Sequence, residues 1–332
     1  MSYYLHKRGD AAINASFPLQ IYFMTTIEKL LVKLIKIPSF SGSEGKIGNF
    51  IISQLKSFKT RKQIVDGKRF NIVAKKGNSK KWLVAHMDTV AGNIPLKIDS
   101  RNIFGRGACD NKQSIAASII AGNQLSDINL LFTVGEEFDF AGAKKAQRSG
   151  IISKKDLAII QEPTNFEIIT GQRGVITFTI QTMGKAAHSS IDQQNNAIQK
   201  LISLLYFLEK KKWTAFNVGL ISGGIAGNIV SDRAEATVVV RPNDIAEYNR
   251  IRRELRKLDA KVIIKNDFKP FINNAMPLPL KIGKGFSEMA FFKNSIKFGA
   301  GNIRFAHSDN EQISRADLNI LPLWLIRLIQ SI

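Results

Sequence analysis

The sequence predicts an α/β domain with a mostly parallel sheet, interrupted by a smaller inserted α+β domain of ferredoxin-like order. Three observations support this. Short apolar segments alternate with helical patterns in the first half of the chain, as in a sheet covered on both faces. After Gly171 the patterns follow the order β-α-β-β-α-β. From about residue 275 the α/β pattern returns. We expect the α/β domain to comprise 24–172 and 272–332, and the insertion to comprise 173–271.

Two helices are expected to open the α/β domain. Thr25 and Glu28 form a capping box at the start of the first helix, and Pro38 ends its apolar repeat. A Ser/Gly loop at 39–45 separates it from a second helix, whose apolar face lies within 47–55. The next segments are short, apolar and rich in β-forming residues. They predict buried strands at 69–75, 82–86, 128–134 and 157–161, with a helix at 111–123.

The inserted domain begins with the alternating segment Val175 to Met183, which is typical of a half-buried strand. The elements expected after it are a helix at about 193–211, strands at 215–221 and 233–241, a helix at 245–258 and a strand at 260–265. The elements expected after the insertion are a helix at 287–292, a strand at 296–298 and an amphipathic helix at 316–329.

The composition excludes several classes of protein. Hydrophobic residues make up 44% of the 332 residues, too many for a disordered chain. The single cysteine, Cys109, permits neither an intramolecular disulfide nor a cysteine-based zinc finger, which favours the cytoplasm. The longest uncharged stretch, 213–231, is too rich in glycine and asparagine for a membrane span. Residues 1–23 do not fit a signal peptide and are interpreted as a dispensable extension before Met24.

The formal net charge of +21 is the unusual feature of the composition. It is consistent with a nucleic-acid partner, with an acidic partner or with a coding bias toward lysine. Nucleic-acid binding is disfavoured because the basic residues occur as scattered pairs, such as Lys75-Lys76 and Lys154-Lys155, without interleaved aromatic residues.

Histidine and carboxylate residues lie at the ends of the predicted strands and in turns. His86 ends a buried strand, and Asp88 follows on the same face, a spacing that suits a metal-binding imidazole oriented by a carboxylate. Asp110 lies in a glycine-rich turn just before a helix, where it has either a ligand role or an N-cap role. The alternative for His86 is a strand-end histidine that serves only the fold.

More carboxylates follow the next strands. Glu136 and Glu137 end an apolar strand, where two adjacent charges are costly unless a positive group lies nearby or both are exposed. Glu162 ends another buried strand, and His307 follows a glycine loop. Two imidazoles and three carboxylates, His86, Asp110, Glu137, Glu162 and His307, form a mixed nitrogen and oxygen set that suits a pair of zinc ions.

Residues 24–332 resemble the dinuclear zinc deacylase and exopeptidase family, which includes acetylornithine deacetylase, acetyl-lysine deacetylase, succinyl-diaminopimelate desuccinylase, aminoacylase and glutamate carboxypeptidase. The resemblance rests on six motifs in order: His-x-Asp, Gly-Arg-Gly-x-x-Asp-x-Lys, Glu-Glu, Glu-Pro-Thr, Gly-x-x-Ala-His-Ser-Ser and Ala-His-x-x-Asn-Glu. Two residues depart from the family pattern, Gln113 in place of a glycine and Ala300 in place of a proline. The 91–98 run is most similar to the acetyl-lysine and acetylornithine branch.

The resemblance implies a role for each matching residue. Asp110 would bridge two zinc ions, with cobalt or manganese as alternatives. His86 and Glu162 would complete the first metal site, and Glu137 and His307 the second. Glu136 would be the general base, with Asp88 behind His86. His188, on the inserted lid, would stabilise the oxyanion in the active site of a second subunit. The residues expected to bind substrate are Asn228, Arg241, Gly299 and Gly301.

The implied function is hydrolysis of the amide bond of a small anionic N-acyl amino acid by a metal-bridged hydroxide. Substrates of the N-acetylornithine, N-acetyl-lysine or N-succinyl-diaminopimelate type, in arginine or lysine biosynthesis, are expected. A dipeptidase or carboxypeptidase with the same site is the alternative. The resemblance also implies a homodimer formed through the lid. A small acidic carrier protein is a further expected partner, since a basic surface would attract it.

Overall fold

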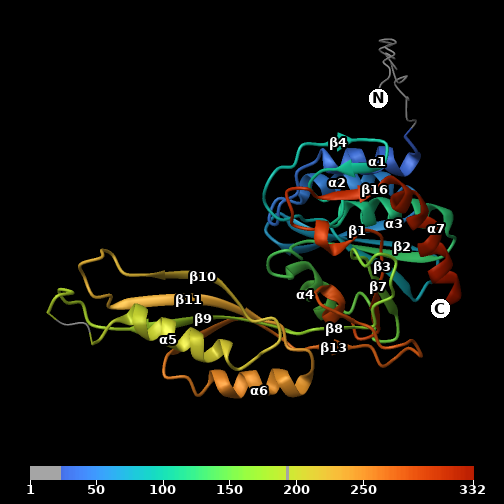
Figure 1. Cartoon of the computed structure of the whole chain (residues 1–332). Helices are drawn as coiled ribbons and strands as arrows, with labels where there is room; N and C mark the ends of the chain where they lie inside the picture. Colours follow the sequence, from blue (N-terminus) through green and yellow to red (C-terminus); the bar gives the residue numbers. More distant parts are fainter. Residues whose placement is uncertain (1–23, 192–193) are drawn as a thin grey trace, which may run out of the picture.

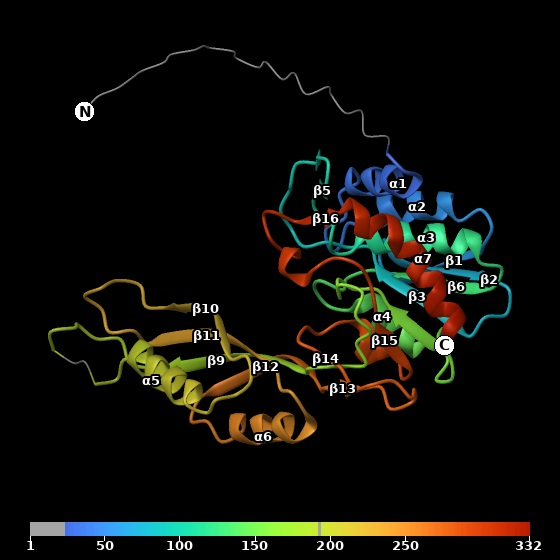
Figure 2. The same cartoon turned by 45° about the vertical axis from the view of Figure 1, so that its right-hand side comes forward.

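The computed structural model describes residues 24–191 and 194–332, and the predicted extension 1–23 lies outside these residues. Figure 1 shows a larger α/β part and a smaller part that extends to one side of it. The chain passes from the larger part to the smaller part and later returns, and the two connecting segments lie close together in both views (Figures 1 and 2). Within the described ranges, no helix is both long enough and apolar enough to cross a membrane.

A six-stranded sheet forms the centre of the larger part, in the order β1-β2-β6-β3-β7-β15. Its strands are β1 (Lys59–Asp66), β2 (Arg69–Lys76), β3 (Lys81–His86), β6 (Ile128–Thr133), β7 (Leu157–Ile160) and β15 (Ser295–Lys297). β3 is parallel to β6 and β7, and β15 is parallel to β7, whereas β1 and β2 pair antiparallel at one edge. The expected parallel arrangement is thus confirmed for β6, β3, β7 and β15.

Alternate residues of each central strand pack into two different cores. Leu83 and Ala85 of β3 face one core, and Trp82 and Val84 face the other, as the two-residue period of a strand requires. The helices of the first core are α1 (Thr26–Ile35), α2 (Gly45–Gln54), α3 (Lys112–Gln124) and α7 (Arg315–Ser331). Those of the second are α4 (Ala141–Arg148) and the 3-10 turn η1 (Glu288–Phe291). The sheet is therefore buried on both faces.

Two small sheets complete the larger part. One, in the order β16-β5-β4, pairs β4 (Lys97–Ile98), β5 (Asn102–Phe104) and β16 (Gln312–Ser314). The other, in the order β13-β8-β14, pairs β8 (Gly171–Gln172), β13 (Phe271–Ile272) and β14 (Ile282–Gly283) at the junction with the smaller part. A second 3-10 turn, η2 (Ile303–Phe305), lies near the end of the chain.

The smaller part, called the lid here, has the predicted order β-α-β-β-α-β. Its elements are β9 (Val175–Met183), α5 (Ala197–Glu209), β10 (Asn217–Gly223), β11 (Arg233–Val240), α6 (Ile245–Leu255) and β12 (Lys261–Phe268). Its sheet has the order β10-β11-β9-β12, and both helices pack on it around a core of their own. The inserted ferredoxin-like domain is therefore confirmed.

β1 and α4 were missing from the expectations, as were the short strands of the two small sheets and the turn η2. β1 carries three basic residues, and only Gln63 among its residues is buried, so its composition indicates a loop. α4 is short and polar, and follows Phe140, whose φ of 54° is left-handed. The helix expected at 287–292 is the 3-10 turn η1, which begins at its N-cap Ser287.

Candidate metal centre

The candidate site lies at the carboxyl ends of three neighbouring parallel strands. His86 is the last residue of β3, Glu136 and Glu137 follow β6, and Glu162 follows β7. Because parallel strands end at the same edge of a sheet, these side chains converge, as ligands do in other open α/β sheets. Asp110 reaches the same edge from the turn before α3, whose N-cap is Asn111. Asp110 therefore has no capping role.

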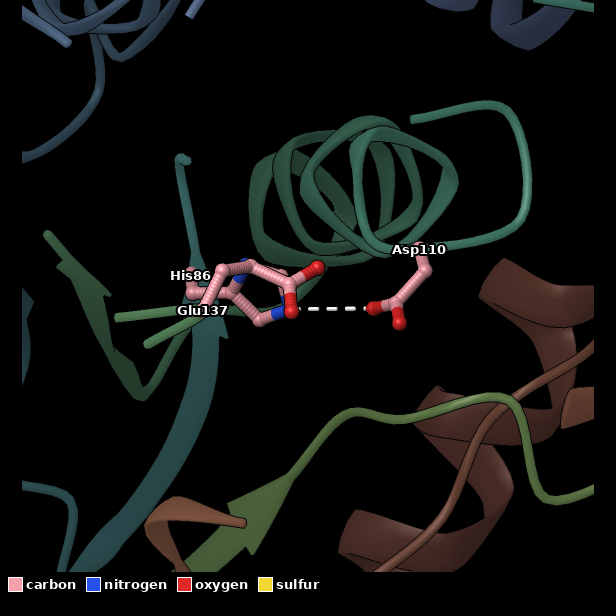
Figure 3. A group of neighbouring side chains, drawn as sticks. All are labelled: His86, Asp110 and Glu137. Atoms are coloured by element: carbon pink, nitrogen blue, oxygen red, sulfur yellow. Dashed lines mark hydrogen bonds and ion pairs between the residues drawn. The ribbon is translucent and has the colours of Figure 1, made fainter. Parts of the chain in front are cut away.

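Asp110 lies between two imidazoles. Its Oδ1 is 3.0 Å from Nε2 of His86, and its Oδ2 is 3.5 Å from Nε2 of His307. Figure 3 shows the imidazole of His86 and the carboxylates of Asp110 and Glu137 directed toward one another. Ligand atoms of these three residues all lie within 4.8 Å of one another. Each oxygen of Asp110 thus serves one half of the candidate site.

His307 joins the group from the loop after η2. Its Nε2 lies 2.8 Å from Oε1 of Glu137, and hydrogen bonds to Asp110 and Glu137 raise its pKa to about 10. The backbone of His307 has a φ of 60°, in the left-handed region that few non-glycine residues adopt. Such strain clusters at functional sites, where the surroundings enforce it.

Asp88 contacts His86 through its main-chain oxygen, whereas the sequence predicted a contact through its carboxylate. Nδ1 of His86 lies 2.9 Å from the main-chain oxygen of Asp88, whereas the Asp88 carboxylate is 3.6 Å away. That carboxylate instead accepts the backbone N–H groups of Glu136 and Glu137, each at 3.0 Å. Asp88 thus orients the imidazole through its carbonyl and holds the Glu136-Glu137 turn through its side chain.

The carboxylates carry more negative charge than their surroundings balance. Burial, followed by repulsion from Asp110, raises the pKa of Glu162 to about 8. Burial, with repulsion from Glu162, also raises the pKa of Glu136 well above its ordinary value, and burial raises that of Glu137. Oε1 of Glu162 is buried and has no hydrogen-bond partner. These groups therefore fit divalent cations, which would neutralise the charge and occupy the unpartnered oxygen.

Arg241, which directly follows β11 in the lid, interacts electrostatically with Glu136 of this centre. Burial and the nearby Arg173 lower its pKa, and attraction to Glu136 opposes them. Arg173 was missing from the predicted site, although the Gly171–Gly174 turn carries it. Two guanidinium groups near a buried carboxylate suit a carboxylate on a ligand.

The glycine loop lies against the centre. A Cβ at Gly299 would meet the main-chain oxygen of Glu162 at 2.5 Å, so only glycine fits there. However, the N–H of Gly299 donates to Oγ1 of Thr164 at 3.0 Å. Gly299 can therefore donate to a ligand only if that bond breaks, and substrate binding by Gly301 stays a prediction.

The structure does not bring His188 and Asn228 into this group of ligands. The segment 184–191, which follows β9, lies at the end of the lid away from the larger part (Figures 1 and 2). Within it, His188 is exposed and pairs with Ile229, and Ser189 donates to the main-chain oxygen of Asn228 at 3.1 Å. His188 and Asn228 thus form a second group on the lid.

One sequence relative decides the family, and a domain model agrees with it. A peptidase dimerisation domain model of the M20 family matches residues 170–264. An M20 peptidase domain-containing protein of Schizosaccharomyces pombe is 31% identical over 86% of this chain and 79% of its own length. The chain belongs to the M20 peptidase family. A probable carboxypeptidase of Aspergillus clavatus is 33% identical over 63% of this chain, and the match spans 60% of that relative's length, less than two thirds.

Solved structures share the M20 fold. A tripeptidase of Staphylococcus aureus superimposes with a TM-score of 0.78 at 20% identity, covering 92% of this chain and 97% of the tripeptidase. A dinuclear metal-binding M20 peptidase of Bacillus subtilis gives a TM-score of 0.65 at 16% identity, covering 92% of this chain and 98% of the peptidase. The chain therefore has the M20 fold, an α/β domain with an inserted dimerisation domain. Its membership of the M20 peptidases places it in a family of metal-dependent hydrolases.

A buried ion pair behind the metal centre of this M20 chain was also missing from the predictions. Glu311 is 1% exposed, and its Oε2 pairs with Nη1 of Arg106 at 2.8 Å. Its Oε1 accepts the N–H groups of Cys109 and Asp110, at 3.1 and 3.0 Å. Because Glu311 lies four residues after His307, it ties the turn of Asp110 to the loop of His307.

Arg106→Met is expected to destabilise the protein by about 3–5 kcal/mol, because it leaves the Glu311 carboxylate buried without its partner. Guanidinium unfolding followed by tryptophan fluorescence measures the loss. The matched control is Arg233→Met, whose partner Glu235 is 38% exposed, and there no measurable loss is expected because solvent screens the pair. Equal losses in the two variants would contradict the role given to the buried pair.

Proposed function

We propose that this M20 chain hydrolyses the amide bond that precedes a terminal amino acid with a free carboxylate, in the manner of a carboxypeptidase or dipeptidase. One observation carries the proposal. Glu136, 9% exposed, lies within charge-interaction range of both the candidate metal ligands and Arg241. A proton-accepting carboxylate thus lies near the group that would bind a carboxylate and near the ligands that would hold the metal.

Each residue of the site has a separate role in this reaction. His86, Asp110, Glu137, Glu162 and His307 would hold two metal ions, with zinc favoured by the ligand set. When bound, such ions lower the pKa of water and polarise a carbonyl group. Glu136 would take the proton of the attacking water and pass it to the leaving nitrogen. Arg241 would bind the terminal carboxylate, and its bidentate guanidinium would fix the orientation of the amide.

Hydrolysis of an N-acyl amino acid in arginine or lysine biosynthesis is the second candidate. The 91–98 run favours it, because that run resembles the acetylornithine and acetyl-lysine deacetylases. The names of the relatives, probable carboxypeptidases among them, favour peptides instead. Both candidates share an amide nitrogen on an amino acid with a free carboxylate, and they differ in the acyl group.

One substrate panel tests both. Zinc-loaded protein is assayed with dipeptides and tripeptides that have free or amidated carboxyl ends, and with N-acetylornithine, N-acetyl-lysine and N-succinyl-diaminopimelate. We expect hydrolysis of free peptides and much slower hydrolysis of the amidated ones. Faster turnover of an acetylated amino acid would make the deacylase the function. Equal rates on free and amidated peptides would contradict a terminal carboxylate site.

A homodimer formed through the lid is also proposed. β10 is the edge strand of the lid sheet, and all its residues are exposed, with Leu220 70% and Ile221 60% exposed. α5 exposes Tyr206 and Phe207, at 58% and 48%. An exposed apolar edge strand favours pairing with another chain. In such a dimer, His188 and Asn228 would be supplied to the partner's site.

Mixing two inactive variants tests this sharing of residues. His188→Ala and Glu136→Ala are each expected to have little activity. After they are unfolded together and refolded, heterodimers are expected to recover roughly a quarter of the wild-type rate, because half of the chains form heterodimers with one intact site. The control is each variant refolded alone. No recovery in heterodimers verified by mass would contradict action of His188 across the dimer.

A further inference from the structure

A cavity of about 490 Å³ opens beside Glu162. Its walls come from the loop that follows β7, from the segment 281–287 around β14 and from Lys297 at the end of β15. Glu162 is itself part of the wall, so the cavity borders the proposed metal centre. None of the roles assigned above uses this cavity or Lys297.

Lys297 is a buried cation in a rigid position. Its residue is 5% exposed, and its backbone pairs with Ile160 of β7 on one side and with Ile169 on the other. Its Nζ donates to the main-chain oxygen of Gly285 at 3.1 Å. A Cβ at Gly283 would lie 3.0 Å from that Nζ, so the absence of a side chain there leaves room for the ammonium group. The wall near Nζ is thus formed largely by glycine backbone.

The charges around Lys297 leave a positive surplus on the cavity side. Burial lowers the pKa of Lys297, and attraction to Glu162 and Glu136 opposes that shift. Glu162 would be neutralised by a metal ion, and Glu136 by the proton it takes during turnover. At the rim, Lys281 is already paired with Glu167 at 2.5 Å, whereas Lys284 is exposed. A buried ammonium group without a dedicated carboxylate is costly unless a ligand supplies one.

We propose that this cavity binds a second carboxylate of the substrate, and that Lys297 is the buried cation that receives it. The inference rests on the proposed function, because it extends the substrate beyond the carboxylate assigned to Arg241. It narrows the substrate class to molecules with two carboxylates. The second carboxylate lies either on an acyl group, such as succinyl, or on an acidic terminal residue.

Selectivity within matched substrate pairs tests the proposal. The pairs are N-succinyl against N-butyryl derivatives of one amino acid, and peptides ending in Glu against peptides ending in Gln. The wild type is expected to prefer the dicarboxylate of at least one pair by tenfold or more in kcat/KM, and the pair that responds identifies the source. In Lys297→Met that ratio is expected to fall at least tenfold.

Lys81→Met is the matched control, because Lys81 is a partly buried lysine on β3 that likewise donates to a main-chain oxygen, that of Ile329 at 2.6 Å. Its selectivity ratio is expected to match the wild type. A wild type that prefers the dicarboxylate in neither pair would overturn the proposal. So would a Lys297→Met variant whose ratio is unchanged, since the lysine would then serve only to balance Glu162.

A binding measurement on the wild type tests the cavity without requiring turnover and without requiring that the Lys297→Met variant folds. Calorimetry compares glutarate with butyrate on the zinc-loaded protein, and glutarate is expected to bind at least tenfold more tightly. If no amide is hydrolysed but glutarate is preferred, the proposed function fails and the cavity assignment stands. If amides are hydrolysed and the two acids bind equally, the cavity assignment fails.

Discussion

Glu136→Ala is expected to reduce kcat by at least roughly a thousandfold, while the protein keeps its metal ions. Glu136 is not among the proposed ligands, and its backbone position is held by the Asp88 carboxylate rather than by its own side chain. Truncation therefore removes the proton acceptor and leaves the turn intact. The measurement is the rate on the best substrate of the panel, with the metal content determined by mass spectrometry.

The conservative variant Glu136→Gln distinguishes the loss of proton transfer from the loss of side-chain volume. It keeps the size of the side chain but cannot accept a proton at neutral pH, so a loss similar to that of the alanine variant is expected. Glu209→Gln, at the end of α5, is the control and should retain the wild-type rate. A metal-loaded Glu136→Ala enzyme with near-normal turnover would remove Glu136 from the mechanism.

Asp110→Asn is expected to lower bound zinc from two ions to fewer than one per chain, and activity to below about 1% of the wild type. One residue serves both halves of the centre, since its two oxygens lie 3.0 Å from His86 and 3.5 Å from His307. The amide keeps the shape but loses the charge and one acceptor oxygen. Metal analysis after dialysis against metal-free buffer measures the loss.

Two further variants provide comparisons for the metal loss expected in Asp110→Asn. His307→Ala is expected to lose one ion, because it removes a ligand of one site only. Asp99→Asn alters a half-buried aspartate that is not a proposed ligand and that accepts N–H groups from Arg101 and Asn102, and it should retain both ions. An Asp110→Asn protein that still holds two ions would show that Asp110 does not bridge them.

The parts of the fold that local patterns control were predictable. Val175 to Met183 alternates apolar and polar residues, and β9 has these bounds because one face is buried in the lid core. His86, Glu137 and Glu162 were recognised because polar groups at the ends of apolar strands are unusual. Parallel pairing of those strands then brings the groups together, which the alternation of strands and helices already favoured.

Other features depend on contacts between distant segments, which no local pattern records. Lys297 lies in a short buried strand, and its surroundings come from residues 162 and 283–285. Arg106 and Glu311 are 205 positions apart, and each alone is an ordinary charged residue. β1 was missed because an edge strand with one solvated side tolerates a polar composition.

The small sheet at the junction has a consequence for how such a chain could arise. Gln172 of β8 faces Phe271 of β13, so the chain leaves the catalytic domain and re-enters it at paired residues. The lid has its own core, separate from the two cores of the catalytic domain. A single genetic insertion between two neighbouring strand residues could therefore add the whole lid, since a short turn would otherwise join them.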